Sequence, residues 1–373
     1  MQTTLAPEFK GTRDGDAAEA ILRKCVHCGF CTATCPTYQL LGDELDGPRG
    51  RIYLIKQVLE GKAVTRSTQQ HLDRCLTCRN CESTCPSGVQ YGHLVDIGRK
   101  VVDERVERPA GEKAVRWLLK EGLTSPLFGP AMKMGQLVRP LLPATLQAKV
   151  PGRAPANAHR WPTREHERKV LMLMGCVQPA MMPNINSATA RVLDAAGIQT
   201  LVADGAGCCG ALRTHLSDSE GGLADMRRNV DAWWPLVSAG KIEAIVMNAS
   251  ACGATVKDYG HALAHDPAYA ERARRIAALT KDISELLPDL VPRLKPKLRR
   301  QGARKLAFHP PCTLQHGQQL RGGVEEHLGK LGHLAPLAAE VIVSANIGCI
   351  QHLGAGTSTP VRHWVEVLDE ALG

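Results

Sequence analysis

The chain has 373 residues, 14 cysteines, a formal net charge of +9 and only 4% aromatic residues. This length exceeds what one hydrophobic core usually organises, so we expect two or three modules. No run approaches the roughly 18 consecutive apolar residues of a membrane-spanning helix, so any membrane association is expected to be peripheral or through a partner. The scarcity of aromatic residues and of recognition motifs argues against nucleic acid as a partner, and a solvated basic surface facing acidic lipid or an acidic protein explains the charge better.

The cysteines indicate the compartment. They are numerous, they show no disulfide pattern, and residues 1–24 contain no charged-then-apolar leader. A disulfide framework would suit a small secreted chain, which this is not. We therefore expect a protein of the reducing cytoplasm.

The first predicted element is a short helix over residues 17–24, which leads into the run Cys25-x-x-Cys28-x-x-Cys31-x-x-x-Cys35-Pro36. An amphipathic helix is predicted over residues 50–60, because apolar residues recur there at helical spacing, namely Ile52, Ile55, Val58 and Leu59. The same spelling then returns as Cys75-x-x-Cys78-x-x-Cys81-x-x-x-Cys85-Pro86. The two runs are thus connected by a helix.

The duplicated run is typical of iron-sulfur clusters. A 4Fe-4S cube needs four thiolates around it, and two-residue gaps allow one curled loop to supply three of them. In the two-cluster arrangement the cysteine before proline ligates the other cluster. We therefore assign Cys25, Cys28, Cys31 and Cys85 to a first cluster, and Cys75, Cys78, Cys81 and Cys35 to a second.

Zinc is the main alternative for these eight cysteines. A tetrahedral zinc site usually has paired Cys-x-x-Cys knuckles, and a third cysteine at the same interval with a fourth before proline is superfluous for it. Four arginines lie close to the thiolates in sequence, and they either raise a cluster's potential or are plain surface residues: Arg49, Arg51, Arg74 and Arg79.

Residues 111–146 contain apolar runs broken by prolines, which predict helical hairpins. Their large apolar side chains could contact a quinone or a membrane, but packing against a neighbouring module is the plainer interpretation: Trp117, Leu118, Leu119, Leu127 and Phe128. Residues 151–168 mix proline, alanine and charge without periodicity, so we interpret them as an interdomain linker.

The remaining cysteines follow predicted parallel strands. A strand over residues 170–174 leads to Gly175-Cys176, a strand over 199–202 precedes Gly207-Cys208-Cys209-Gly210, and a strand over 242–247 leads to Asn248-x-x-x-Cys252. Helices are predicted between them, over residues 184–196 and 218–238. Because α/β sheets gather ligands at the carboxyl ends of their strands, we expect four thiols to converge: Cys176, Cys208, Cys209 and Cys252.

A weaker copy of this pattern begins at Lys305. A strand over residues 306–308 leads to His309-Pro310-Pro311-Cys312, a helix covers about 324–331, and a strand over 341–345 leads to Asn346-x-x-Cys349. The interval from Cys312 to Cys349 is about half of that from Cys176 to Cys252, so one strand, one helix and the Cys-Cys-Gly segment are absent. Two cysteines cannot hold a cluster unaided, and we expect them to be buried free thiols more readily than ligands.

Histidines have no spacing that demands a metal. Surface or supporting roles are expected for His27, His93, His215 and His261. His309 and His316, which bracket Cys312, are better candidates for a hydrogen bond to a sulfur.

With these motifs together, the chain resembles the iron-sulfur subunit of glycolate oxidase over nearly its whole length. Several local spellings carry the resemblance, besides Cys208-Cys209-Gly210: Gly175-Cys176-Val177-Gln178-Pro179, Asn248-Ala249-Ser250-Ala251-Cys252-Gly253, His309-Pro310-Pro311-Cys312-Thr313-Leu314-Gln315-His316, Asn346-Ile347-Gly348-Cys349 and Val361-Arg362-His363-Trp364. Subunits of lactate utilisation, anaerobic glycerol-3-phosphate dehydrogenase and heterodisulfide reductase are similar in architecture, and they stay open as alternatives.

The resemblance implies an α+β multidomain fold. It comprises a helix-rich ferredoxin domain with two 4Fe-4S clusters (1–105), a helical connection and linker (106–168), a first cysteine-rich CCG repeat (169–295) and a second, truncated repeat (296–373). Family members usually carry a second Cys-Cys-Gly segment between the positions of Cys312 and Cys349. Its absence here leaves the first repeat to hold a third cluster, with Cys312 or Cys349 as alternative ligands.

The implied function is electron transfer within an oxidoreductase complex. Partner subunits would carry FAD and oxidise glycolate to glyoxylate, and electrons would pass through this chain toward a quinone or other membrane acceptor. No dinucleotide fingerprint is present, so no catalytic residue is assigned here. The resemblance implies a cytoplasmic protein, peripheral on the inner face of the cell membrane. An enzyme resembling heterodisulfide reductase and a structural or regulatory zinc protein remain the two alternatives from other classes.

Overall fold

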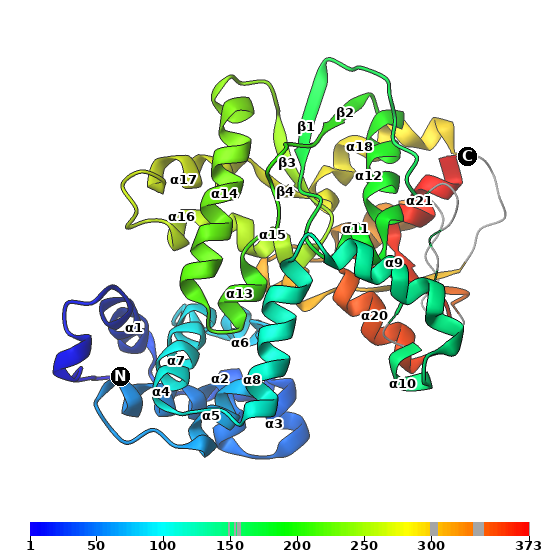
Figure 1. Cartoon of the computed structure of the whole chain (residues 1–373). Helices are drawn as coiled ribbons and strands as arrows, with labels where there is room; N and C mark the ends of the chain where they lie inside the picture. The colour runs from blue at the N-terminus through cyan, green and yellow to red at the C-terminus, as the bar shows by residue number, and fades with distance from the viewer. Residues whose placement is uncertain (148–149, 153, 155–157, 299–304, 331–338, 373) are drawn as a thin grey trace. The chain divides into compact units, whose positions relative to one another are not determined.

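The computed structural model describes residues 1–147, 150–152, 154, 158–298, 305–330 and 339–372. The chain divides into two compact units, which are residues 1–116 with 213–220 (the helical unit) and residues 117–212 with 221–373 (the sheet unit). The first unit is built from helices and the second contains two parallel sheets, as the sequence predicted (Figure 1). Within the described ranges, no helix is both long and apolar enough to cross a membrane.

The helical unit consists of short and medium helices joined by the cysteine loops. They are α1 (Arg13–Lys24), α2 (Phe30–Ala33), α3 (Pro36–Leu41), α4 (Pro48–Leu59), α5 (Arg66–Asp73), α6 (Asn80–Thr84), α7 (Tyr91–Arg105) and nearly all of α8 (Ala110–Trp117). Residues 213–220 add the end of α13 (Ala211–His215). The two helices predicted here, over residues 17–24 and 50–60, are confirmed as α1 and α4.

Both confirmed helices begin earlier than predicted, for local reasons. The Thr12 side chain accepts a hydrogen bond from the Gly15 amide and so caps α1, and Pro48 occupies the first turn of α4, where its missing N–H costs nothing. The apolar face of α4 is buried against α7. Gly98 allows this close packing, because a Cβ there would lie 2.6 Å from Ile55.

The first sheet of the sheet unit has the order β2-β1-β3-β4, with every pairing parallel. Its strands are β1 (Arg168–Met172), β2 (Ile198–Leu201), β3 (Ala244–Met247) and β4 (Thr280–Asp282). The first three confirm the predicted strands, whereas β4 was missed because it is three residues long and polar at every position. The flanking helices are α11 (Gln178–Met181), α12 (Pro183–Ala195), α14 (Ser219–Ser238), α15 (Ser250–Lys257), α16 (Tyr259–Ala262), α17 (Ala270–Leu279) and α18 (Leu287–Leu294).

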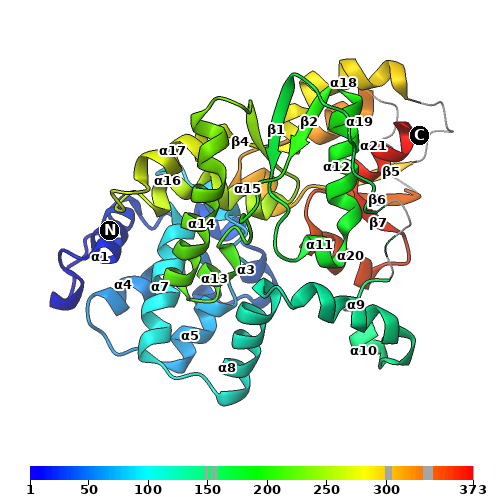
Figure 2. The same cartoon turned by 45° about the horizontal axis from the view of Figure 1, so that its top comes forward.

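Alternate residues of these strands enter two hydrophobic cores. Val170 and Val246 belong to the core that contains α12, whereas Leu171 and Ile245 belong to the core that contains α14. Figure 2 shows α12 and α14 on either side of the strands. Both faces are therefore buried, which leaves the strand ends as the place for polar and thiol groups.

The second sheet has the order β5-β6-β7 and is also parallel. Its strands are β5 (Leu306–His309), β6 (Val341–Ser344) and β7 (Val361–His363), with helices α19 (Gly323–Lys330), α20 (Ile347–Gly356) and α21 (Trp364–Leu372). The strands predicted at 306–308 and 341–345 and the helix at 324–330 are confirmed, while Leu331 lies outside the described residues. Both sheets contribute to one core, which contains Val170, Leu306 and Val343.

Residues 117–147 form helices, as the apolar runs predicted. These are a π-helix (Leu118–Gly122), α9 (Phe128–Val138), a 3₁₀ turn (Arg139–Leu141) and α10 (Ala144–Gln147). Trp117, Leu118 and Leu127 are exposed, and their packing against a neighbouring module stays a prediction. In the predicted linker, residues 158–167 contain neither helix nor strand; residues 153 and 155–157 lie outside the described ranges.

Candidate iron-sulfur sites

The two cysteine loops of the helical unit share one backbone conformation. His27 and Gly29 have φ of 56° and 87°, and Thr77 and Arg79, at the same offsets from Cys75, have φ of 53° and 59°. Left-handed conformations are rare for side chains other than glycine, and especially so for a β-branched threonine. The repeated strain curls each loop so that its three cysteines face one side.

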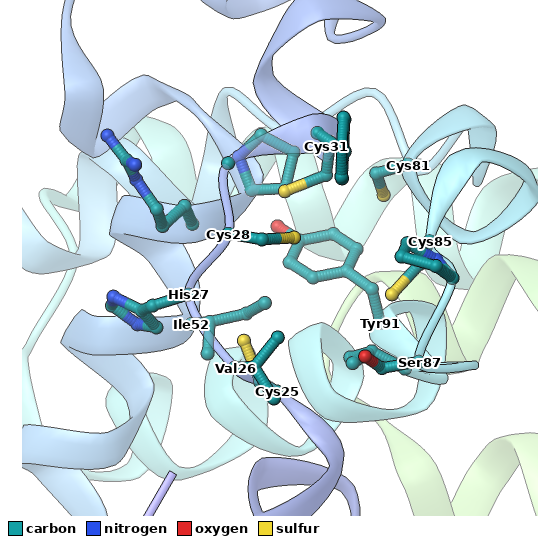
Figure 3. A pocket seen from close by; sticks show the side chains of 16 residues that line it. Cys25, Val26, His27, Cys28, Cys31, Ile52, Cys81, Cys85, Ser87 and Tyr91 are labelled. Carbon is teal, nitrogen blue, oxygen red and sulfur yellow. The ribbon is translucent and has the colours of Figure 1, made fainter.

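The thiols sort into two cavities. One is lined by Cys25, Cys28, Cys31 and Cys85 and also by Cys81, and Figure 3 shows their sulfur atoms arranged around one space beside Tyr91. The other is lined by Cys35, Cys75, Cys78 and Cys81. Each cysteine that precedes a proline thus lies with the three thiols of the opposite loop.

Burial raises the pKa of two of these cysteines and so favours their protonated form when no metal is bound. Burial, followed by the nearby Cys25, raises the pKa of Cys31 to about 11. The pKa of Cys81 is raised further by burial and by Cys75. Four negative sulfurs in one apolar cavity therefore need a compensating cation, and bound iron provides that charge while keeping the thiols deprotonated.

The spacing of the sulfurs disfavours a single zinc ion. Four thiolates on one zinc lie about 3.8 Å apart, given a Zn–S distance of about 2.3 Å. Among the residues that the structure describes, only Asp43, Asp46 and His71 bring three His, Cys, Asp or Glu ligand atoms within 4.8 Å of one another. In the described ranges no three cysteine sulfurs approach that closely, and a cube spreads its four thiolates more widely than one ion does.

Tyr91 provides a second sign that the cavities are built for a bound group. It lines both cavities, its side chain is buried, and its hydroxyl has no hydrogen-bond partner within the described part of the chain. Burial and the neighbouring Cys75 raise the pKa of Tyr91 well above its usual range, so the hydroxyl remains a proton donor. A buried donor without an acceptor is costly, and the sulfurs of a bound cluster would satisfy it.

Of the four arginines singled out in the sequence, Arg51 is the buried one. Its side chain is 1% exposed and lies near Asp46, at 3.4 Å. Arg74 donates to the other Asp46 oxygen at 2.8 Å. Burial raises the pKa of Asp46, but hydrogen bonds from His71 and Arg74 outweigh burial and hold it below the usual range. Asp46 is therefore a paired anion and not a free cation ligand. Arg49 and Arg79 pair with Glu44 and Glu82.

The four thiols of the first repeat converge at the carboxyl edge of the first sheet. Hydrogen-bond contacts connect Cys176 with Cys208, Cys208 with Cys209, and Cys209 with Cys252. Hydrogen bonds from Cys176 and then Cys209 lower the pKa of Cys208, while the hydrogen bond to Cys208 raises the pKa of Cys176. Cys208 is therefore the thiol that loses its proton most readily, with Cys176 and Cys209 as the donors to it.

Two residues that the sequence did not single out hold the Cys208-Cys209 segment. Asn229 donates to the Cys208 carbonyl at 2.8 Å and to the Tyr259 hydroxyl at 3.0 Å. Tyr259 in turn donates to the Cys209 carbonyl at 2.9 Å. They lie 21 and 50 positions from their partners, so no local motif could reveal them. Gly210 allows the sharp turn, with φ of 93° and a Cβ position 2.7 Å from the Gly222 carbonyl.

The second repeat contains two cysteines, half the number of thiolates that a 4Fe-4S cluster needs. Cys312 is exposed and Cys349 is half-buried, so the expectation of buried thiols is wrong for Cys312. Burial and then the charge of Cys312 raise the pKa of Cys349. The His309 ring contacts the Ser344 hydroxyl at 3.4 Å, and Arg321 contacts His316 at 3.5 Å. A hydrogen bond from either histidine to a sulfur stays a prediction.

Fold and thiol geometry together define the class, an iron-sulfur protein with a ferredoxin-type module and a cysteine-rich module. Residues 21–89 match the 4Fe-4S dicluster domain family. Residues 170–257, which contain Cys176, Cys208, Cys209 and Cys252, match the cysteine-rich domain family.

Relatives specify the family within this class. The chain is 50% identical to the glycolate oxidase iron-sulfur subunit of Escherichia coli (strain K12), across 100% of this chain and 99% of the relative. It is 31% identical to the probable glycolate oxidase iron-sulfur subunit of Bacillus subtilis (strain 168), across 76% and 68%, and 24% identical to lactate utilization protein A of Bacillus licheniformis, across 54% and 99%. The chain therefore belongs to the family of glycolate oxidase iron-sulfur subunits.

The alignment also bears on the shortened repeat. It extends over 411 positions in the E. coli comparison, which exceeds the 373 residues of this chain. That relative therefore contains segments that this chain lacks.

Proposed function

We propose that this chain is the electron-transfer subunit of a glycolate-oxidising complex and that its helical unit holds two 4Fe-4S clusters. Cys25, Cys28, Cys31 and Cys85 hold the first, and Cys35, Cys75, Cys78 and Cys81 hold the second. Bound clusters supply one-electron transfer. The observation that carries the proposal is the exchange of the two proline-flanked cysteines between the cavities, which matches two-cluster ferredoxins.

The residues around each cavity make it suitable for this role. Ile52 and Val89 are buried in the wall of the first cavity and exclude water from the thiols. Cys28 is exposed, and Val26 beside it is 68% exposed, so one edge of the first cavity lies near the surface. A redox partner can therefore approach closely without any opening of the fold.

We further propose a third iron-sulfur cluster on Cys176, Cys208, Cys209 and Cys252. The convergence of the four thiols supports it, as does the low pKa of Cys208, since a thiolate is the form that binds iron. Cys312 and Cys349 are two thiols without a second pair, so they do not form a cluster site of their own.

The partners follow from the family. Partner subunits carry FAD and oxidise glycolate to glyoxylate, and a quinone or another membrane acceptor takes the electrons that leave this chain. The chain itself performs no substrate chemistry and has no catalytic residue. Its location is cytoplasmic, with peripheral attachment to the inner face of the membrane.

Copurification with the flavin subunits tests the proposal. The Cys78→Ser variant should lose iron and glycolate-dependent dye reduction, because a serine cannot replace the thiolate at the second cavity. The matched control is Cys312→Ser, which changes an exposed cysteine outside both cavities and should keep both properties. Full dye reduction in an iron-depleted Cys78→Ser complex would contradict the proposed route.

Lactate is the second candidate substrate, because lactate utilization protein A aligns with about half of this chain. The substrate pocket lies on the partner subunits, so the complex itself has to be tested. Dye reduction by the purified complex with glycolate and with lactate at equal concentrations distinguishes the two. Faster reduction with lactate would overturn glycolate as the substrate without touching the electron-transfer role.

A further inference from the structure

Thr37 contacts a sulfur of the second cavity. It lies two residues after Cys35, in the first turn of α3, and its side chain is buried. Its hydroxyl oxygen lies 3.2 Å from the Cys35 sulfur and 2.8 Å from the Asp46 carbonyl oxygen. Arg51 donates to the same hydroxyl oxygen from 3.1 Å. One threonine hydroxyl therefore connects a cluster ligand with the buried arginine.

Counting protons fixes the direction of these bonds. A hydroxyl has one proton and two lone pairs, and a guanidinium can only donate. Arg51 therefore occupies a lone pair of Thr37, which leaves the hydroxyl proton for the Asp46 carbonyl or the Cys35 sulfur. A cysteine that ligates iron is a thiolate and has no proton, so Thr37 can only be the donor in the contact with Cys35, and it shares its one proton between that sulfur at 3.2 Å and the Asp46 carbonyl at 2.8 Å. A negative sulfur also attracts the proton more strongly than a neutral carbonyl does.

Arg51 is fixed by two further contacts. Its Nε donates to the His71 carbonyl at 2.7 Å, and another nitrogen lies 3.4 Å from Asp46. Asp46 also pairs with Arg74, at 2.8 Å, so two arginines share one carboxylate. Asp43 adds a second carboxylate, within 4.8 Å of Asp46 and His71. The charges of the two arginines are therefore matched, and Arg51 acts on Cys35 by positioning Thr37.

The first cavity lacks this arrangement. Ser87 occupies the position after Cys85-Pro86 that Thr37 occupies after Cys35-Pro36, and it lines the first cavity. Its side chain is only half-buried, and within the described ranges its hydroxyl makes no hydrogen bond. The duplicated motif is therefore equipped with a positioned donor at one cavity and not at the other.

We propose that Thr37, positioned by Arg51, donates a hydrogen bond to the Cys35 sulfur and thereby raises the reduction potential of the cluster at the second cavity. This inference rests on the proposed function. One electron arrives from the upstream donor, no bond breaks, and Thr37 keeps its proton. The added negative charge strengthens the hydrogen bond, so the reduced state is stabilised more than the oxidised state.

Thr37→Val tests the inference, because valine keeps the shape and removes the hydroxyl. We expect about a tenfold fall in the equilibrium constant for reduction at the second cavity, which is about 59 mV for a one-electron couple. The readout is an anaerobic redox titration followed by electron paramagnetic resonance, which measures both cluster potentials in the isolated subunit. Thr37→Ser should restore the wild-type value, and Ser87→Ala is the matched control that should leave the second potential unchanged.

Each outcome decides between the claims. Unchanged potentials in a fully iron-loaded Thr37→Val protein would overturn the inference alone. If Thr37→Val and the smaller Thr37→Ala both lose iron, the hydroxyl is needed to retain the cluster, and its role in setting the potential is likewise overturned. A wild-type protein that binds no iron would overturn the proposed function, and this inference with it.

Discussion

In the helical unit the thiols lie in loops between helices of only four to six residues, whereas in the sheet unit they extend from the edge of a sheet with its own core. Cys81 and Cys35 border cavities between strained loops, one of which Arg99 holds by donating to the Cys75 carbonyl at 2.6 Å. Cys208 and Cys209 are held by Asn229 and Tyr259 before any metal binds. Iron bound by cysteines can therefore be essential for folding in the helical unit, whereas in the sheet unit it binds to a site that is already folded.

Removing iron should have the largest effect, and on one unit only. We expect chelation under anaerobic conditions to destabilise the helical unit by more than about 5 kcal/mol, because metal binding energy is folding energy in such loops. All five tryptophans lie in the sheet unit, at positions 117, 161, 233, 234 and 364. Circular dichroism should lose helix signal while the tryptophan emission wavelength stays constant. A simultaneous red shift of the tryptophan emission would show that the sheet unit also unfolds and would contradict this difference between the two units.

Acid should weaken the sheet unit through His363, which is fully buried. Burial lowers the pKa of His363 to about 4, and its Nε2–H donates to the Asn248 carbonyl at 2.9 Å. Because the folded pKa lies below the usual 6.5, this contribution is complete above pH 6.5 and is lost as the pH falls toward 4, by about 3 kcal/mol. Glu366 nearby has a raised pKa and acts in the opposite direction.

A variant separates the contribution of His363 to the pH dependence of stability from that of Glu366. Urea unfolding of iron-free protein, followed by tryptophan emission between pH 4 and pH 7, should show a shallower pH dependence in His363→Asn than in the wild type. Equal slopes for the two proteins would contradict the assignment to His363.

Gly210→Ala should destabilise the sheet unit by about 3 kcal/mol, with or without iron. Its left-handed backbone costs an alanine about 1–2 kcal/mol, and the new Cβ would approach the Gly222 carbonyl. Gly205→Ala is the matched control, since its φ of 85° is similar and nothing lies within 4 Å of the added Cβ. Urea unfolding measures both variants. A loss in Gly210→Ala that occurred only in the iron-bound protein would contradict a preformed scaffold.

Cys349→Ser should have the smallest effect. The second repeat contains only two thiols, so we expect unchanged iron content and a change in stability within about 0.5 kcal/mol. Iron analysis and thermal unfolding against the wild type check this. A loss of iron from Cys349→Ser would show that the second repeat contributes a ligand after all.

The sequence predicted those features that depend on local pattern. The spacing of the two cysteine runs was enough to group each cysteine before proline with the opposite loop, as the cavities do, although Cys81 lines both cavities. Hydrophobic periodicity located α4, α12 and the strands that precede Cys176 and Cys252. Contacts between residues far apart in the sequence could not be predicted from local pattern. Tyr91, with its unpartnered hydroxyl, and Asn229 became visible only once the chain had folded around the thiols.

Short elements were missed for a related reason. Strands β4 and β7 have three residues each, too few for a period of two to be recognised, and their pairing partners decide their structure. Arg51 could not be separated from its neighbours Arg49 and Arg74 by sequence, since burial depends on the packing of α4 against the loop that contains Asp46.

Counting iron and inorganic sulfide in anaerobically purified protein tests the central claim most directly, which is that cysteines of both units hold clusters. We expect about twelve irons per chain, falling to about eight in Cys208→Ser, while the helical unit keeps its two clusters. A wild-type protein with zinc in place of iron and no acid-labile sulfide would contradict the account.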